Sequence, residues 1–203
     1  AHTQEMRIEQ NMTLIYDLKV DELKTQPAYE KEWNIRGWNA SLDRMTPEQR
    51  EAWITSYKPR NEQFIAQKLQ GEELVKWKYQ RYIKDYLRCI KSIDDEVGRL
   101  LAYLEREGLM DNTVIVYTSD QGFYMGEHGW FDKRFMYEES FRTPLIIRYP
   151  QQIKAGSECQ ALVQNIDYAP TYLALAGIEK PEQMVGRPLV PLFGGEIPED
   201  WRE

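Results

Sequence analysis

Residues that cross-link small proteins or hold a structural metal are scarce in this sequence. Its 203 residues include two cysteines and two histidines. Two cysteines do not make a disulfide framework, and neither Cys89 nor Cys159 belongs to a Cys-x-x-Cys pair. A structural zinc site is therefore not expected. Cys89 falls on an apolar helical stripe, and we expect it to be a small core residue.

The chain also lacks a surplus of basic residues and any long apolar run. It has 26 Lys and Arg against 33 Asp and Glu, a net charge of -7, which argues against a sequence-independent nucleic-acid binder. No apolar run approaches the roughly 20 residues of a membrane helix, so no transmembrane segment is expected. The first residues show neither the basic nor the apolar part of a signal peptide. Hydrophobic residues make up 42% of the chain, which is enough for a buried core.

Helical patterns dominate the first 110 residues. Apolar residues in 4–24 recur at roughly helical spacing, and 25–45 is expected to be a structured connector. Thr46–Gln49 predicts a helix start with a capping box, and Pro59 should end or kink that helix.

A longer helix is predicted from about 72 to 107, with Gly108 as its stop. Its apolar residues are spaced mostly three and four apart, so one stripe should face a core. The stripe comprises Ile83, Leu87, Ile90, Ile93, Val97, Leu100, Leu101 and Leu104.

After residue 110 the pattern changes to short strands. Residues 113–118 are rich in β-branched side chains and predict a strand buried on both faces, as in a parallel sheet. Residues 144–149 predict a second strand, and 167–176 a short helix with Pro170 in its first turn and Gly177 as its stop. The order of helix, strand, loop and strand predicts an α/β fold.

Oxygen-bearing side chains follow the first of these strands. Asp120 and Gln121 stand in the segment Ser119–Gly122, at the carboxyl end of the strand, where open α/β sheets bind ligands. A carboxylate and an amide oxygen suit Ca²⁺ or Mg²⁺. An ordinary turn is the alternative, and these four residues alone favour it.

The loop 126–134 shifts that balance towards a site. It places one histidine and two cations, His128, Lys133 and Arg134, between glycines and aromatic residues. Such a set could hold a sulfate or a phosphate. The alternative is a solvated loop with Trp130 and Phe131 packed beneath it.

In their order along the chain, these motifs resemble the formylglycine-dependent sulfatases of the alkaline phosphatase superfamily. The matching segments are Thr113–Gly122, Gly126–Arg134, Arg142–Ile147, Asn165–Thr171, Leu173–Gly177 and Gly186–Leu189. The resemblance covers about residues 80 to 193 and is greatest to bacterial sulfatases that act on host glycans. It implies part of an alkaline-phosphatase-like sheet flanked by helices, with a helix-rich N-terminal portion. We divide the chain into a helical and connector segment (1–71), a catalytic-core segment (72–150) and a C-terminal segment (151–203).

The resemblance also implies roles for the candidate residues. Asp120 matches a carboxylate ligand of a calcium ion, and Gln121 stands where many members have Asn or His. Lys133 matches the lysine that contacts the sulfate, and His128 matches a loop position that is often His and faces the substrate. Both are candidate catalytic and substrate-binding groups. Arg134 is a further candidate for substrate binding, without a role given by the family.

The family's nucleophile motif, Cys/Ser-x-Pro/Ala-x-Arg, is not found in this chain. Neither Cys89 nor Cys159 is followed by it, and in Ser56–Arg60 the proline stands one place late. The first pair of calcium aspartates is missing too, because Asp94 and Asp95 lie within the predicted helix. His2 is not in the usual context of the general acid. The chain therefore resembles the C-terminal half of a sulfatase, and by itself it should be inactive.

The expected parent is a sulfuric ester hydrolase that uses calcium and acts on a sulfated carbohydrate. The resemblance implies a periplasmic or extracellular location in a bacterium, and a partner that is either the missing N-terminal half or a second copy of the chain. A phosphoesterase or phosphonate hydrolase of the same superfamily is the first alternative, because both anions are tetrahedral oxyanions. A non-catalytic helical interaction module is the second.

Overall fold

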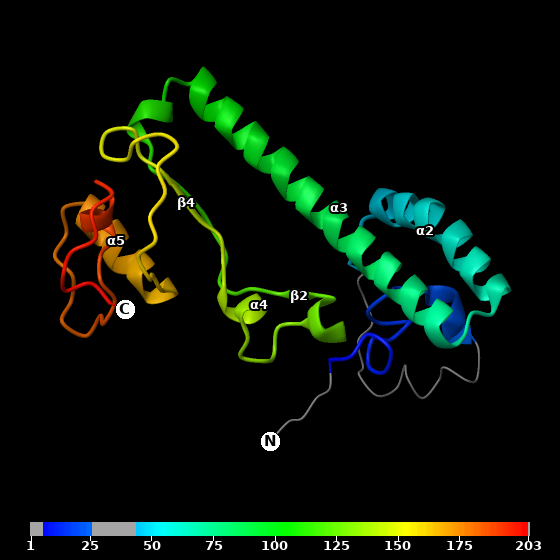
Figure 1. Ribbon diagram of the computed structural model, residues 1–203. Coiled ribbons are helices and arrows are strands. Elements are labelled where there is room, and N and C mark those ends of the chain that lie inside the picture. The colour runs from blue at the N-terminus through cyan, green and yellow to red at the C-terminus, as the bar shows by residue number, and fades with distance from the viewer. Residues whose placement is uncertain (1–5, 26–43, 203) are drawn as a thin grey trace. The chain divides into compact units, whose positions relative to one another are not determined.

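The computed structural model of the protein describes residues 6–25 and 44–202 (Figure 1). The chain forms two compact units. Unit 1 comprises Ala1–Asp95 and Phe123–Phe141, and unit 2 comprises Glu96–Gly122 and Arg142–Glu203. The predicted connector 25–45 lies outside the described residues except at its ends, and His2 lies outside them as well. The division into 1–71, 72–150 and 151–203 stays a prediction.

The first elements of unit 1 are η1 (Asp21–Thr25), α2 (Pro47–Gln67) and most of α3 (Gly71–Arg106), whose residues from Glu96 on belong to unit 2. The predicted capping box is present. The Gln49 amide donates to Thr46 Oγ1 at 3.3 Å, and the Thr46 amide donates to Gln49 Oε1 at 3.0 Å. Pro59 was expected to end or kink this helix; it does not end it, because α2 continues to Gln67, and a kink stays a prediction.

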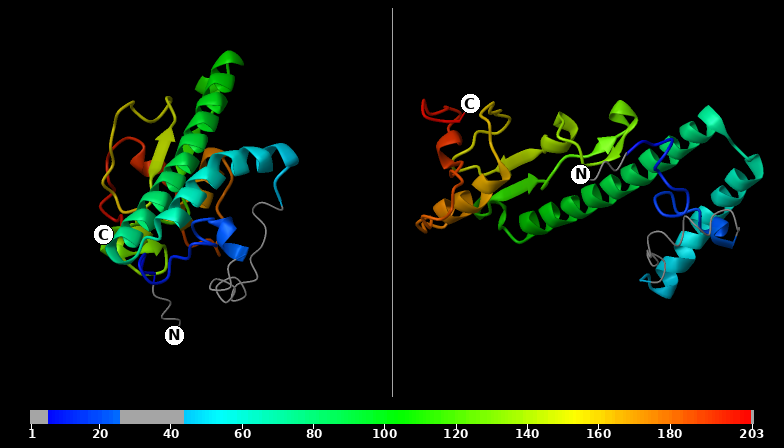
Figure 2. Two further views of the ribbon diagram at one scale, coloured as in Figure 1. Left: turned by 90° about the vertical axis from the view of Figure 1, so that its right-hand side faces the viewer. Right: turned by 90° about the horizontal axis from the view of Figure 1, so that it is seen from below.

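The predicted helix in 4–24 is wrong, although its apolar residues are buried as a core requires. Residues 6–20 form turns, and the core formed around them includes Met12, Ile15 and Leu18, each 1% exposed. Phe64 of α2 stacks on Trp77 of α3 with ring centroids 3.7 Å apart, where α2 and α3 approach each other (Figure 2). Side-chain burial, rather than backbone helicity, therefore sets the apolar pattern of this segment.

The predicted long helix is confirmed as α3, but its stripe is largely uncovered. Leu87 and Leu100 are each 54% exposed, and Cys89, expected in the core, is exposed too. Periodicity identifies the apolar face of a helix but not whether the same chain supplies the surface that covers it. Gly108 ends the helical segment as predicted, with a φ of +66° and the Leu109 amide donating to the Leu104 carbonyl at 2.8 Å.

Unit 2 contains a two-stranded sheet of β1 (Ile115–Thr118) and β4 (Leu145–Arg148). The strands run antiparallel, with Val116 opposite Ile147 and Tyr117 opposite Ile146. Both strands were predicted and are present. The prediction that the first of them, β1, is buried on both faces in a parallel sheet is wrong. Tyr117 and Ile146 share one face as cross-strand partners, and both are exposed. The predicted mixture of helices and strands is confirmed. The described sheets have two strands each, so the larger sheet of an alkaline-phosphatase-like fold stays a prediction.

The C-terminal part of unit 2 packs against that sheet. It includes η5 (Asn165–Asp167), α5 (Tyr168–Leu175) and η6 (Val190–Leu192). The short helix predicted in 167–176 is therefore confirmed, and Gly177, with a φ of +69°, follows it. Leu189, Leu192, Phe193 and Trp201 form the buried cluster, against which Leu145 and Ile147 of β4 pack. None of the described helices is long and apolar enough to cross a membrane.

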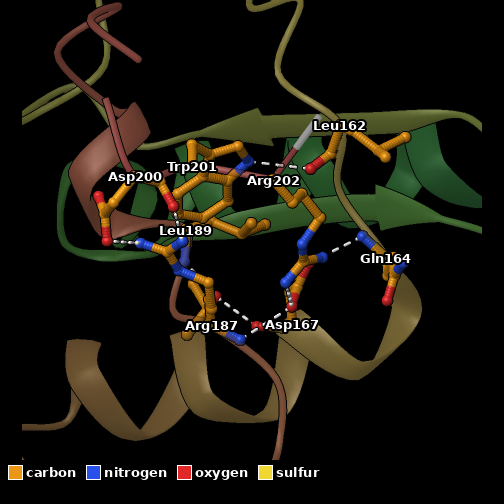
Figure 3. Close-up of polar contacts among 9 residues, drawn as sticks. Leu162, Gln164, Asp167, Arg187, Leu189, Asp200, Trp201 and Arg202 are labelled. Atoms are coloured by element: carbon orange, nitrogen blue, oxygen red, sulfur yellow. Dashed lines mark hydrogen bonds and ion pairs between the residues drawn. The ribbon is translucent and has the colours of Figure 1, made fainter. Parts of the chain in front are cut away.

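A buried carboxylate fastens the C-terminal loops together (Figure 3). Asp167 is fully buried and accepts hydrogen bonds from the Gln164 amide (2.8 Å), the Arg187 amide (2.9 Å) and the Arg202 guanidinium. Burial alone would raise the pKa of Asp167, but the hydrogen bonds from Arg202 and the two amides hold that pKa below its ordinary value. Gly186 lies so close that an added Cβ would stand 1.9 Å from the Ile166 carbonyl oxygen.

Candidate functional site

Asp120 and Gln121 follow the end of β1 in unit 2, as predicted. The strand ends at Thr118, whose Oγ1 lies 2.9 Å from the Tyr168 hydroxyl of α5. Ser119 Oγ donates to the Gln121 carbonyl at 2.9 Å, which closes the turn. The Asp120 carbonyl accepts a hydrogen bond from Asn165 Nδ2 at 2.6 Å. The backbone of this turn is thus fixed by one hydrogen bond within the turn and by one from Asn165.

The side chain of Asp120 is left available by these contacts. Asp120 is exposed, and the nearest donor to its carboxylate is Ser119 Oγ at 3.4 Å. A carboxylate and an amide oxygen fit a hard cation in chemical type. They would fill two places of the 6 to 8 oxygens around Ca²⁺. Among the described residues, no three or more His, Cys, Asp or Glu side chains gather in a group that could hold a metal, so the other ligands would have to come from elsewhere.

In unit 1 the loop 126–134 forms a tight hairpin. β2 (Tyr124–Met125) pairs antiparallel with β3 (Phe131–Asp132), and η4 (Glu127–Gly129) connects them. Gly126 has a φ of +121°, and a Cβ there would come within 2.7 Å of the Tyr79 ring of α3. Glycine is required at this position by both its backbone and its neighbour.

The hairpin is held by the N-terminal segment and by α3. The Ile8 amide donates to the Gly129 carbonyl and the Phe131 amide donates to the Met6 carbonyl, each at 3.0 Å. Tyr82 of α3 donates its hydroxyl proton to the Tyr124 carbonyl at 2.8 Å. Burial raises the pKa of Tyr82, so it stays a neutral donor. Two separate stretches of sequence, the N-terminal segment and α3, therefore hold this one loop.

His128 sits at the tip of this hairpin with a left-handed φ of +58°. Its ring centroid lies 5.2 Å from that of Trp130 and 5.4 Å from that of Tyr137. Its Nε2 lies 3.1 Å from Glu139 Oε1. A histidine with a carboxylate partner and a half-exposed ring has the equipment to hold or donate a proton.

Lys133 and Arg134 differ in how their charges are engaged. Lys133 is exposed and makes no hydrogen bond or ion pair with any described residue. Arg134 Nε donates to Asp132 Oδ2 at 2.8 Å. Asp132 itself has a φ of +74°, which is unusual for a residue with a side chain. The amine of Lys133 is therefore available for an anion, whereas the guanidinium of Arg134 is partly neutralised.

The structure brings His128, Lys133 and Arg134 together on one loop of unit 1, whereas Asp120 and Gln121 belong to unit 2. Convergence of the two sets on one site stays a prediction. Sequence reasoning did not identify Glu139, because nothing in the segment around Glu138 and Glu139 signals that one of them reaches a residue eleven positions earlier.

Comparisons with known proteins place these residues in a family. Residues 126–203 match the family described as N-sulphoglucosamine sulphohydrolase, C-terminal. The chain is 47% identical to the N-acetylglucosamine-6-O-sulfatase of Bacteroides thetaiotaomicron over 205 aligned residues, which cover 100% of this chain and 36% of that protein.

Solved structures agree with the sequence comparison. A protein solved in complex with its substrate D-glucosamine-2-N,6-O-disulfate is 47% identical, with a TM-score of 0.84 over 99% of this chain and 40% of that one. A phosphonate monoester hydrolase from Silicibacter pomeroyi is 31% identical, with a TM-score of 0.59 over 79% of this chain and 29% of that one.

The match to the Bacteroides thetaiotaomicron sulfatase includes the whole of the present chain but little more than a third of the length of the sulfatase itself. The matched region described as C-terminal carries the hairpin with His128, Lys133 and Arg134. These matches confirm the resemblance drawn from the sequence motifs: the chain is similar to a C-terminal segment of sulfatases.

Proposed function

We propose that this chain is part of an enzyme that hydrolyses sulfate esters on a glycan. The observation that carries the proposal is the 47% identity over the whole chain to an N-acetylglucosamine-6-O-sulfatase. The solved relative bound to a disulfated glucosamine supports a sulfated sugar as the substrate class. The amine of Lys133, which has no partner among the residues that the structure describes, gives the hairpin a group that can bind a sulfate.

In this proposal the residues of the chain bind and orient the sulfate group. Lys133 neutralises its oxygens, and that interaction strengthens as charge develops in the transition state. His128 lies on the substrate side, where it binds the sugar or transfers a proton to or from it. Arg134 is a second cation, and its ion pair with Asp132 partly neutralises its charge.

Asp120 and Gln121 are the residues that would hold a calcium ion. When bound, such an ion would supply positive charge close to the sulfate oxygens. The formylglycine nucleophile and the remaining calcium ligands are expected outside this chain, since their motifs are not found in it. A periplasmic or extracellular location in a bacterium is part of the same proposal.

The 203-residue protein by itself should therefore lack the catalytic centre. Its exposed apolar residues on α3 and on the sheet, such as Leu87 and Ile146, suit a covering partner. That partner is either the remaining part of the same enzyme or a second copy of the chain.

A phosphonate or phosphate ester hydrolase is the second candidate. The similarity to a phosphonate monoester hydrolase favours it, because sulfate and phosphonate groups are both tetrahedral oxyanions. Its identity of 31%, against 47% for the sulfatase relative, makes it the weaker of the two.

A substrate panel on the intact enzyme that contains this chain separates the two candidates. We expect hydrolysis of 6-O-sulfated N-acetylglucosamine with a kcat/KM well above that for a phosphonate monoester. A higher kcat/KM on the phosphonate would replace the sulfatase assignment by the alternative, and turnover of neither ester would reject both.

A further inference from the structure

Glu139 is the carboxylate that contacts His128. It lies in α4 (Glu138–Phe141), and its Oε1 stands 3.1 Å from His128 Nε2. The Glu139 side chain is 25% exposed, whereas that of His128 is 46% exposed. Almost half of the His128 side chain therefore remains accessible in the presence of this contact.

Aromatic side chains confine the plane of the histidine ring. Trp130, Tyr137 and Tyr124 have centroids 5.2, 5.4 and 6.2 Å from that of His128. Tyr124 is fully buried, and its hydroxyl donates to the Phe135 carbonyl at 3.2 Å. These contacts limit rotation of the ring, but none of them determines which ring nitrogen carries the proton.

The other acidic residues around the hairpin are engaged elsewhere or unpaired. Glu127 Oε2 accepts from the Met125 amide at 2.7 Å. Asp132 pairs with Arg134. Glu138, next to Glu139, is exposed and makes no contact with a described side chain. Among the described carboxylates, Glu139 is therefore the one placed to act on His128.

The chemistry of this pair fixes a proton position. An ionised carboxylate can only accept a hydrogen bond, so Nε2 of His128 must carry a hydrogen in this contact. In the neutral ring the remaining nitrogen, Nδ1, is then the acceptor. Partners of this type set the tautomer and orientation of functional histidines.

We propose that Glu139 is a positioning residue that holds His128 in the Nε2–H tautomer and leaves Nδ1 to face the substrate. The proposal rests on the proposed function for the identity of that substrate. The tautomer itself does not depend on it. Glu139 acts through His128 and touches no reacting atom.

The first test is NMR of the histidine ring nitrogens in the 203-residue protein, recorded at rising pH until the ring signals no longer change. The chain has only two histidines, so a His2→Gln variant assigns the signals. We expect the Nε2–H tautomer to dominate for His128, and its fraction to fall to that of a free imidazole in Glu139→Ala, where no carboxylate remains. In Glu139→Gln, whose amide can donate to Nε2, the Nδ1–H form should increase.

Glu138→Ala is the matched control, because it removes a neighbouring glutamate without touching the ring, and its spectrum should match that of the unmodified protein. A His128 tautomer that is the same in the unmodified protein and in both Glu139 variants would overturn the proposal.

The second test is a double-mutant cycle in the intact enzyme. Glu139→Ala should lower kcat/KM by roughly 10- to 100-fold, the usual cost of losing a partner that orients a functional ligand. Adding it to His128→Ala should cause little further loss, since its effect passes through the ring. Wild-type kinetics for Glu139→Ala, or two losses that multiply, would contradict the proposal. If the unmodified enzyme cleaves no sulfate ester, the proposed function fails, and the NMR result still decides the role of Glu139.

Discussion

At the residue scale, the side chains of the candidate site differ in whether they have a hydrogen-bond or ion-pair partner. Lys133 is unpaired among the described residues, Arg134 is paired with Asp132, and His128 is paired with Glu139. These residues could be selected as candidates from the sequence, because they lie in a loop that follows a strand and is rich in glycine and aromatic residues. Their partners could not, because hydrogen bonds such as that between His128 and Glu139 depend on how the loop folds back.

Replacing Lys133 tests its assigned role. In the intact enzyme we expect Lys133→Ala to lower kcat by roughly 100-fold or more, the cost typical of losing a group that stabilises developing charge. The melting temperature should hardly change, because the side chain is exposed and makes no described contact. Lys154→Ala, an exposed lysine in a loop of unit 2, is the control. Steady-state kinetics equal for the two variants would remove Lys133 from the site.

The buried carboxylate Asp167 makes a prediction about stability. Asp167→Asn should destabilise the protein by roughly 1.5–3 kcal/mol, the range for hydrogen bonds to a charged group. Asp200→Asn is the control, since Asp200 is 79% exposed in its pair with Arg187 and should cost less than about 1 kcal/mol. Urea unfolding of the three proteins at neutral pH gives both differences.

The stability contribution of Asp167 should also depend on pH in a defined direction. Its folded-state pKa is lowered, so its contribution is fully present above the unfolded-state pKa of about 3.9 and is lost as the pH falls through the folded-state value. The gap in unfolding free energy between the unmodified protein and Asp167→Asn should therefore shrink below about pH 4. A gap that widens there would contradict the account of this carboxylate.

At the scale of elements, local signals in the sequence were reliable where they involve neighbouring residues. The capping box at Thr46 and the glycine stop at Gly108 are both present. Patterns that depend on distant partners were less informative. The stripe on α3 indicated a core that the described chain does not provide, and the apolar run in β1 did not reveal its antiparallel partner β4. Residues 6–20 are buried without forming the helix that their spacing predicted.

Two glycines provide a matched test of the hairpin geometry. Gly126→Ala should destabilise the protein by about 1–3 kcal/mol, because its φ is +121° and the new Cβ would meet the Tyr79 ring. Gly98→Ala lies within α3 with nothing inside 4 Å of the new Cβ, and it should stabilise the protein by about 0.5–1 kcal/mol. Opposite shifts in the urea midpoint are the expected result, and equal shifts would mean that the hairpin does not depend on this packing.

At the scale of the whole molecule, the chain matches only part of the length of its sulfatase relatives. It spans 36% of the N-acetylglucosamine-6-O-sulfatase that it resembles and includes the hairpin with the candidate sulfate-binding groups. It contains no formylglycine motif. Large apolar side chains remain exposed on α3 and on the β1–β4 sheet, which agrees with a partner or a second copy covering them.

The most direct test of this account compares the 203-residue protein with the intact enzyme on a chromogenic aryl sulfate, each assayed with and without calcium. We expect turnover by the intact enzyme and a dependence of that turnover on calcium. The 203-residue protein should show no turnover above the buffer, because we propose that the nucleophile lies outside it. Turnover by the 203-residue protein comparable to that of the intact enzyme would contradict the account.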